Sequence, residues 1–327
     1  MSDSAITEGH VGQPDPHSVS GARPATMTAS STALTEPARR LASRQARADL
    51  ALLVITLVWG TSFVLMQESV RLVPPYRFLA WRFGLASIVM LALYGRRLLQ
   101  APRRQVMAAS GIGVTLFVGY AAQIIGLQYT TAARSGFVTG LAVVMVPFAA
   151  LLLLHQRPSL AALVGVTLAG VGLFLLSWPG LGGESSALLR GDLITLVCSV
   201  AFALQIVLVG KHAPNMEAMT LATAQLVAVA LLSALFSLSE AASAAPPLWL
   251  WGGVAFLAVA GTALAFTVQS KAQRFTSPTH VGLIFAMEPV FSGLFAWLVT
   301  GEVLTGRSLL GCGLILAGMV VAEARSS

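Results

Sequence analysis

Apolar runs of roughly 18 to 22 residues recur along this chain from about its fiftieth residue onward. A helix of that length crosses the roughly 30 Å of hydrocarbon in a bilayer. Hydrophobic residues make up 56% of the 327 and charged residues only 10%, and the mean hydropathy is +0.80. A soluble domain carries about 25% charged residues, and its core needs much less apolar surface. The sequence therefore predicts an all-α integral membrane protein.

Turn-forming and charged residues divide the apolar runs into ten predicted transmembrane helices. We expect these helices over residues 50–67, 78–94, 106–127, 136–154, 160–178, 192–209, 218–238, 248–270, 280–299 and 308–322. The preceding residues 1–47 are rich in Ser, Thr, Ala, Pro and Gly, and they lack the apolar stretch of a signal peptide. This segment is predicted to be a disordered cytoplasmic tail.

The positions of the basic residues predict the orientation of the helices. With the N-terminus inside, the pairs Arg96-Arg97 and Arg103-Arg104 fall on the cytoplasmic side, which then carries more Lys and Arg than the outside. An even number of spans places both termini in the cytoplasm, with residues 324–327 as the second tail. Arginine outnumbers lysine eighteen to two, a bias that we associate with GC-rich bacterial genomes. We therefore expect a multi-pass protein of a bacterial inner membrane.

The two halves of the chain are similar in sequence. Residues 120–172 align without a gap with residues 266–318. Matching positions are Tyr120 with Phe266, Gln123 with Gln269, Gly165 with Gly311, and Gly172 with Gly318. We expect one five-helix repeat over residues 48–178, an extracytoplasmic linker over 179–191 and a second repeat over 192–323. Because each repeat has an odd number of spans, the repeats are predicted to be inverted, as in many transporters with a shared central site.

Several short motifs carry a resemblance to a known family. They are Trp59-Gly60-Thr61-Ser62-Phe63, Gln128-Tyr129-Thr130-Thr131-Ala132, Gln273-Arg274-Phe275-Thr276-Ser277-Pro278, and Glu288-Pro289-Val290 followed by Gly301-Glu302. In these motifs the chain resembles the EamA-type transporters of the drug/metabolite transporter superfamily, over roughly residues 51–323. The resemblance implies ten helices in two repeats, both termini inside, export of amino acids or related metabolites, no bound cofactor and no enzymatic activity. The first half has Gln156 where the second has Glu302, so a role of that glutamate does not extend to both halves.

Two ionisable residues, Arg82 and Glu288, lie inside predicted spans. A charge at the bilayer centre costs at least roughly 2.5 to 3.5 kcal/mol on insertion scales, so both residues are candidates for substrate binding. Arg82 would hold a carboxylate, and Glu288 would receive an ammonium group or a proton. Three other interpretations stay open: Arg82 extends to the membrane interface, Glu288 bonds to backbone groups freed by Pro289, or the two side chains pair. Their counterparts in the other half are neutral, approximately Gln225 and Ala142.

Aromatic and amide side chains inside the spans complete the set of candidates. A glutamine in hydrocarbon needs a polar partner, either across a helix interface or in a wet cavity. Gln123 and Gln269 each follow an aromatic residue by one helical turn, which suggests two facing cavity walls suited to a small amphipathic substrate. Packing against neighbouring helices is the alternative. The substrate-cavity candidates are Trp59, Ser62, Arg82, Tyr120, Gln123, Gln205, Gln225, Phe266, Gln269 and Glu288.

Other functional classes lack the residues that they require. The net charge of +7 comes from scattered basic residues without a continuous basic face, so no nucleic-acid partner is expected. Cys198 and Cys312 lack metal-ligand spacing, and no metal site is predicted. An exporter of cationic drugs is the alternative function, followed by a channel or a membrane-embedded enzyme, for which no filter loop or catalytic motif is visible. Glycines clustered in the fifth and tenth helices predict close packing, within the chain or across a homodimer.

Overall fold

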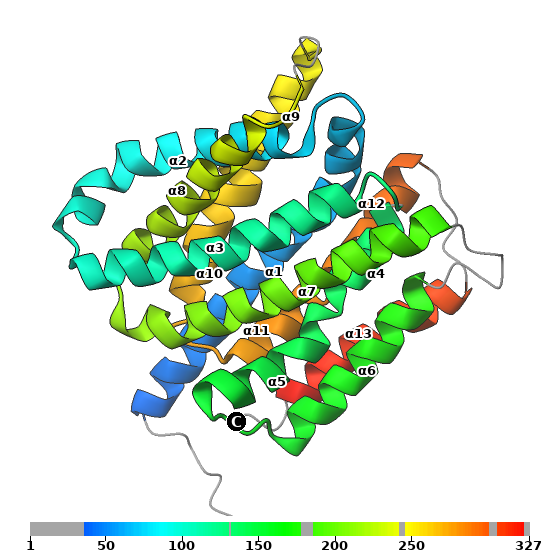
Figure 1. Cartoon of the computed structure of the whole chain (residues 1–327). Helices are drawn as coiled ribbons and strands as arrows, with labels where there is room; N and C mark the ends of the chain where they lie inside the picture. The colour runs from blue at the N-terminus through cyan, green and yellow to red at the C-terminus, as the bar shows by residue number, and fades with distance from the viewer. Residues whose placement is uncertain (1–35, 131, 178–185, 242–245, 301–305, 324–327) are drawn as a thin grey trace, which may run out of the picture.

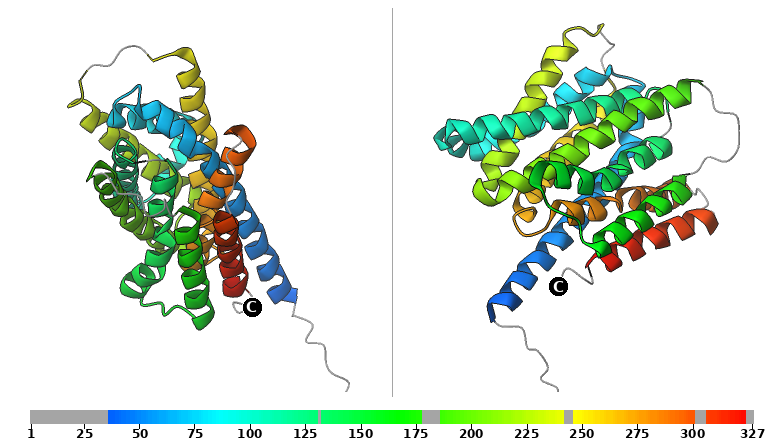
Figure 2. Two further views of the ribbon diagram at one scale, coloured as in Figure 1. Left: turned by 90° about the vertical axis from the view of Figure 1, so that its right-hand side faces the viewer. Right: turned by 60° about the horizontal axis from the view of Figure 1, so that its bottom comes forward.

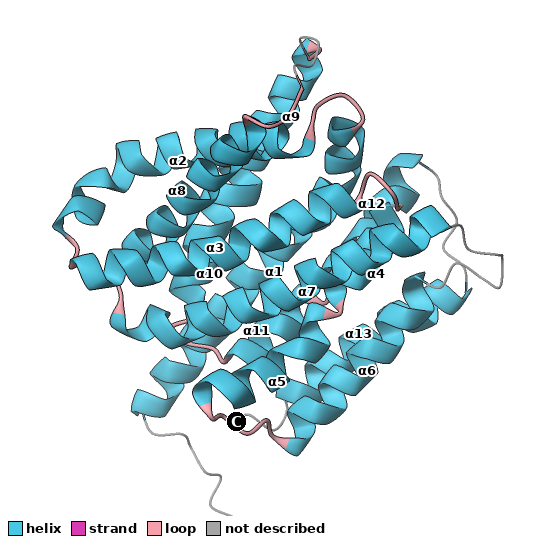
Figure 3. Ribbon diagram, in the orientation of Figure 1, coloured by secondary structure: helices cyan, strands magenta, loops and turns pink. Residues whose placement is uncertain are grey.

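The computed structural model describes residues 36–130, 132–177, 186–241, 246–300 and 306–323. Within these ranges the secondary structure consists of helices and the turns between them, without a strand (Figure 3). Seven helical segments of the described chain are long and apolar enough to cross a membrane, and shorter apolar helices cover Leu160–Leu175 and Leu309–Ala322. The all-α architecture is thus confirmed for this part of the chain, whereas the number of ten spans stays a prediction.

The first half of the chain begins with a helix that is longer than expected. Its helices are α1 (Glu36–Val70), α2 (Pro75–Gln100), α3 (Arg103–Gly126), α4 (Ala132–Gly140), α5 (Ala142–Leu154) and α6 (Leu160–Ser177). Because α1 begins at Glu36, residues 36–47 are helical, and the expectation of disorder there is wrong. Ala, Arg, Leu and Gln dominate this stretch and are strong helix formers. Residues 1–35 lie outside the described chain.

The second half contains two short irregular turns of helix. Its elements are α7 (Ser186–His212), η1 (Ala213–Asn215), α8 (Ala218–Ser237), α9 (Leu248–Ala258), η2 (Val259–Leu264), α10 (Ala265–Ala272), α11 (Pro278–Phe285), α12 (Glu288–Thr300) and α13 (Gly306–Glu323). Residues 186–191 belong to α7 rather than to a linker, because Ala, Leu and Arg extend the helix. The rest of the predicted linker, Glu302 and the tail 324–327 lie outside the described residues.

Two predicted helices are interrupted at corresponding points. Leu141 separates α4 from α5, and Ala286 and Met287 separate α11 from α12. Leu141 and Met287 are the same distance apart in the sequence as Tyr120 and Phe266. The break is therefore a feature of the repeat. A third predicted helix is continuous but contains a π-helical turn, η2, between α9 and α10.

Helices α6 and α13 lie side by side and antiparallel (Figures 1 and 2). A Cβ atom at Gly165 would lie 2.6 Å from the carbonyl oxygen of Gly318, and one at Gly172 would lie 2.6 Å from that of Gly311. Gly165 thus faces Gly318, which is the repeat counterpart of Gly172, and Gly172 faces Gly311, the counterpart of Gly165. A two-fold axis between the repeats produces this pattern. Glycine is needed here because the two backbones touch. These glycines pack within the chain.

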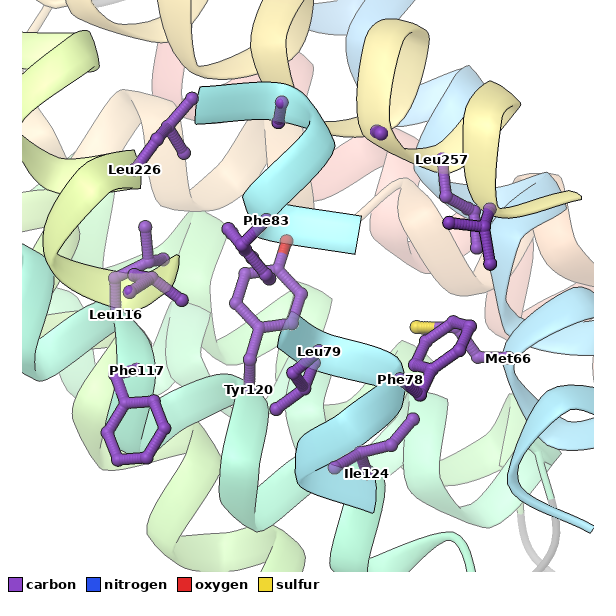
Figure 4. Close-up of a cluster of buried hydrophobic side chains, with 14 of the residues drawn as sticks. Met66, Phe78, Leu79, Phe83, Leu116, Phe117, Tyr120, Ile124, Leu226 and Leu257 are labelled. Atoms are coloured by element: carbon purple, nitrogen blue, oxygen red, sulfur yellow. The ribbon is translucent and has the colours of Figure 1, made fainter. Parts of the chain in front are cut away.

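Several helices form two groups on either side of α1. Helices α2, α3, α8 and α9 gather on one side, and α4, α5, α6 and α13 on the other (Figures 1 and 2). Aromatic and aliphatic side chains, among them Phe78, Phe83 and Leu226, fill the core of the first group (Figure 4). Large apolar side chains also cover the outer surface, and Leu152 is 77% exposed. Such a surface suits contact with lipid.

Candidate substrate cavity

One cavity between the two groups of helices brings most of the candidate residues together. The space between its lining atoms measures about 680 Å³, part of it open to solvent. Nine of the ten candidates line it: Trp59, Ser62, Arg82, Tyr120, Gln123, Gln205, Phe266, Gln269 and Glu288. Gln225 stands behind this wall, where its Oε1 accepts a hydrogen bond of 3.0 Å from Gln205 Nε2. A role of these residues in binding substrate stays a prediction.

Both interrupted helices reach the cavity at their breaks. Gly140 and Ala142 line it from the first half, and Ala286 and Glu288 line it from the second. An interrupted helix exposes backbone polar groups at membrane depth, which is tolerated where the groups border a wet cavity. The sequence predicted Glu288 near the middle of a continuous helix. The structure instead gives it the first position of α12.

The approach of α1 to the second break explains the glycine beside Trp59. A Cβ atom at Gly60 would lie 2.7 Å from the Cβ of Phe291 and 3.1 Å from the carbonyl oxygen of Glu288. The missing side chain therefore lets α1 touch the start of α12, while Trp59 turns into the cavity. Gly60 thus permits a close approach of α1 to α12.

Arg82 is buried, with 1% of its surface exposed, and it binds the π-helical turn η2. Its Nε donates to Thr262 Oγ1 at 2.9 Å, and its Nη2 donates to the carbonyl of Gly261 at 3.3 Å. Its guanidinium also lies 4.8 Å from the ring centre of Tyr120. The interpretation that Arg82 extends to the membrane interface is therefore wrong. No ion pair joins it to Glu288 within the described chain, so a mutual pair is not formed either.

The π-helical turn was not foreseen from the sequence. In η2 the hydroxyl of Thr262 donates to the carbonyl of Leu257, five residues earlier, and Trp59 Nε1 donates to the Gly261 carbonyl at 2.8 Å. A π turn shifts the backbone hydrogen bonds by one residue, and such turns frequently occur at functional sites. Here the turn presents one carbonyl to two side chains, Trp59 and Arg82, from two other helices.

Aromatic rings from both halves form the apolar walls. The ring centre of Trp59 lies 5.8 Å from that of Phe266 and 4.9 Å from that of Phe285. Tyr120 packs edge-on against Phe202 at 5.1 Å and beside Phe83 at 4.9 Å (Figure 4). These geometries are favourable for aromatic pairs and leave ring faces for a cation or an apolar group. Phe202 and Phe285 were missed because a phenylalanine in an apolar run carries no distinguishing signal.

The polar side chains of the cavity differ in their partners. Gln123 Nε2 donates to Thr139 Oγ1 at 3.3 Å, and Ser62 donates to the carbonyl of Val58 on its own helix. Gln269 Nε2 donates both to Gln205 Oε1 and to the Oε1 of Gln273. Both proposed amide roles therefore occur together, since these groups line a cavity and also bond to neighbouring helices.

The family model for EamA-like transporters matches residues 46–178 and, a second time, residues 189–323. The chain belongs to this family. The EamA resemblance seen in the motifs is therefore confirmed, and the protein is a membrane transporter.

Similar proteins span almost the whole transporter. An uncharacterised transporter of Archaeoglobus fulgidus is 29% identical over 85% of this chain and 86% of its own length. The uncharacterised inner membrane transporter YedA of Escherichia coli is 26% identical, over 83% of this chain and 89% of its own. A protein of Chlamydia muridarum named as an S-adenosylmethionine/S-adenosylhomocysteine transporter is 24% identical, over 79% and 88%. A solved crystal structure with 22% identity has a TM-score of 0.71, covering 85% of this chain and 97% of that one, and shows the same fold.

The remaining reactive groups of this EamA-like transporter do not form a metal site in the described residues. Cys198 is buried, with its sulfur 3.8 Å from Thr139 Oγ1, and Cys312 is partly buried. His280, in the first turn of α11, has its Nε2 3.5 Å from Oδ2 of Asp49 on α1. His155 ends α5 with a left-handed backbone conformation, φ 56°. None of these residues lines the cavity.

Proposed function

We propose that this transporter exports small amphipathic metabolites, first of all amino acids with a bulky or aromatic side chain, by alternating access to the cavity described above. In this proposal ten helices form two inverted repeats in a bacterial inner membrane, and both termini are cytoplasmic. The substrate lies between the two broken helices, where each half contributes one wall.

The observation that carries this proposal is the arrangement of two opposite charges. Arg82 and Glu288 line the same cavity but form no ion pair with each other in the described chain. A zwitterion carries a carboxylate and an ammonium group, so it offers a partner to each. The aromatic walls formed by Trp59, Tyr120 and Phe266 supply an apolar surface for the side chain of the substrate.

A second candidate substrate class is supported by part of the same geometry. Glu288 and the nearby rings suit an organic cation, with or without a carboxylate. The Chlamydia muridarum relative is named for S-adenosylmethionine and S-adenosylhomocysteine, and both molecules contain an amino-acid group. Because Arg82 adds a positive charge to the cavity, a substrate with a carboxylate is favoured over a simple cation.

Counterflow in proteoliposomes tests the proposal. Vesicles loaded with an unlabelled neutral amino acid are expected to accumulate labelled phenylalanine or leucine transiently and in a saturable manner. Glu288→Gln and Arg82→Lys should each reduce this exchange at least tenfold, as expected for loss of a charged contact. Glu68→Gln, on the exposed end of α1, is the matched control and should exchange at the wild-type rate.

Four results would contradict the proposal. Exchange of cationic drugs without exchange of amino acids would assign the second class. Currents far above the turnover of a carrier would indicate a channel. Normal exchange by both cavity variants would remove the charged pair from the site. A reporter fused to the C-terminus and active outside the cytoplasm would overturn the proposed topology.

A further inference from the structure

Four buried glutamines form a continuous network behind and along one wall of the cavity. They come from three parts of the chain: Gln205 on α7, Gln225 on α8, and Gln269 and Gln273 at the end of α10. Each is at most 3% exposed. Gln205 Nε2 donates to Gln225 at 3.0 Å, and Gln269 Nε2 donates to Gln205 at 3.1 Å and to Gln273 at 2.9 Å.

Backbone carbonyls fix the direction of every amide in this network. Gln225 Nε2 donates to the carbonyl of Leu221 at 3.1 Å, and Gln273 Nε2 donates to that of Ile206 at 2.8 Å. A carbonyl can only accept, so the amide oxygens of both end residues must face inward. Gln225 therefore accepts from Gln205, whose own oxygen then faces Gln269.

This arrangement of amides leaves Gln269, at the centre of the network, with an oxygen that is unpaired within the described residues. Two acceptors, from Gln205 and Gln273, use both N–H groups of Gln269. Its Oε1 is buried and has no hydrogen-bond partner in the described chain. Rotating the amide by 180° would turn its oxygen toward the oxygens of Gln205 and Gln273, so a flipped amide does not give the oxygen a donor. A buried acceptor without a donor is unfavourable, and Gln269 lines the cavity.

We propose that Gln269 Oε1 accepts a hydrogen bond from the substrate, and that the transporter therefore selects substrates whose cationic nitrogen carries hydrogens. This inference rests on the proposed function. An ammonium group has three N–H donors, enough for Glu288 and Gln269 together, whereas a quaternary nitrogen has none. The aromatic walls accept both kinds of cation, so they do not make this distinction. Gln205, Gln225 and Gln273 are positioning residues that hold the acceptor in place.

The described residues of the first half contain no equivalent acceptor network. Gln123 corresponds to Gln269, but its Nε2 donates to a hydroxyl, that of Thr139. A hydroxyl can both donate and accept, so it does not fix the direction of the amide. The selection is thus expected to depend on Gln269 and not on Gln123.

The test compares phenylalanine with its N,N,N-trimethyl derivative as competitors in the counterflow assay. The ratio of their inhibition constants is measured within one protein, so it does not depend on the amount inserted. Wild-type protein should prefer phenylalanine on the order of tenfold. Gln269→Met, which keeps the length of the side chain, should reduce the preference to about threefold or less. Gln105→Met, far from the cavity near the cytoplasmic end of α3, should keep it.

The positioning residues keep the test decisive if Gln269→Met does not insert. Gln273→Met removes the anchor on Ile206 and should lower the preference partly, because the Gln269 amide loses one of the two hydrogen bonds that hold it. An equal affinity of wild-type protein for both competitors would overturn the inference while leaving amino-acid exchange intact. An undiminished preference in both Gln269→Met and Gln273→Met would overturn it as well. Absence of phenylalanine exchange in wild-type protein would instead refute the proposed function.

Discussion

The same helix contact occurs twice in this transporter, once with a charge and once without. Arg82 on α2 contacts Gly261 and Thr262 of η2. Ala228 on α8 follows Arg82 in the sequence by the same interval as Phe266 follows Tyr120, and it contacts Gly113 of α3. The first contact is polar and spread over a π turn. The second is a backbone contact, since a Cβ atom at Gly113 would lie 2.6 Å from the carbonyl oxygen of Gln225, and also 2.7 Å from the Cβ of Ala228.

The difference shows how a repeat can become asymmetric without losing its fold. A long side chain between α2 and its neighbour is accommodated by an altered helical turn, while a methyl group leaves α3 regular. The positive charge of Arg82 is thus confined to one side of the cavity. Gln225, the approximate counterpart of Arg82 expected from the sequence, and Ala228, one helical turn further on, both contact Gly113.

Arg82→Ala gives α2 the side chain that α8 has at the corresponding position, and it should have the largest effect. The variant loses two hydrogen bonds, the contact with Tyr120 and the volume of the side chain, at a cost of about 3 kcal/mol. Thermal denaturation in detergent measures the loss. The exposed Arg96→Ala on the same helix should change the midpoint little. Equal midpoints for both variants would mean that η2 does not depend on the arginine.

Gly113→Ala disturbs the neutral version of the contact. The added methyl group would lie 2.6 Å from the carbonyl oxygen of Gln225, so α3 and α8 must separate, which costs about 2 kcal/mol. Gly111 lies two residues away, and a Cβ atom there meets nothing within 4 Å. Gly111→Ala should therefore be neutral or stabilising by up to about 1 kcal/mol. The same denaturation assay distinguishes the two, and an unaffected Gly113→Ala would contradict the backbone contact.

Thr262→Val tests the polar contact with little change of shape. It removes the acceptor for Arg82 Nε and should cost about 1 to 2 kcal/mol. Thr115→Val is the matched variant in the corresponding stretch of α3, where the hydroxyl bonds to its own helix at Ile112. It should cost less than Thr262→Val. If the thermal midpoints fall equally, the hydroxyl of Thr262 serves its own helix and not Arg82.

Glu217→Gln tests a tie between α2 and α8 outside the membrane and should have the smallest effect. Burial raises the pKa of Glu217, but hydrogen bonds from Thr220 and from Arg97 outweigh it and lower the pKa below its usual range. Its charged form therefore stabilises the fold at neutral pH, and this stabilisation is lost as the pH falls through the lowered pKa.

The magnitude is below about 1 kcal/mol, because the side chain of Glu217 is 44% exposed and solvent screens the pair with Arg97. Thermal midpoints of wild type and Glu217→Gln should differ at pH 7 and converge well below about pH 4. Glu68→Gln is the control for an exposed glutamate. A difference that grows on acidification would reverse the assigned sign.

Long apolar segments made the helices predictable, because the length of a membrane span is set by the bilayer. Polar side chains within those segments led to the cavity, because the indole N–H of Trp59 and the amide of Gln269 need hydrogen-bond partners that lipid does not offer. The break between α4 and α5 was not predictable, because Leu141 is an ordinary helix former and Pro147 lies inside α5 without ending it. Pro289, the second residue of α12, was a signal for the other break.

Two features of the site depend on contacts that a single sequence does not reveal. The π turn η2 contains ordinary apolar and small residues, and its shifted hydrogen bonds accompany the docking of Arg82 and Trp59. Gln273 lies beyond the end of the predicted helix 248–270, although its spacing of four residues from Gln269 places both on one helix face. That spacing was the signal that could have found it.

The glycine contacts between α6 and α13 restrict how the two halves can move. With Gly165 against Gly318 and Gly172 against Gly311, sliding by part of a turn would drive side chains into backbone. Rotation about this line is the motion that remains. Displacement grows with distance from the axis of rotation, so in the proposed alternating access α2 and α8, on the far side of the cavity, would travel farthest.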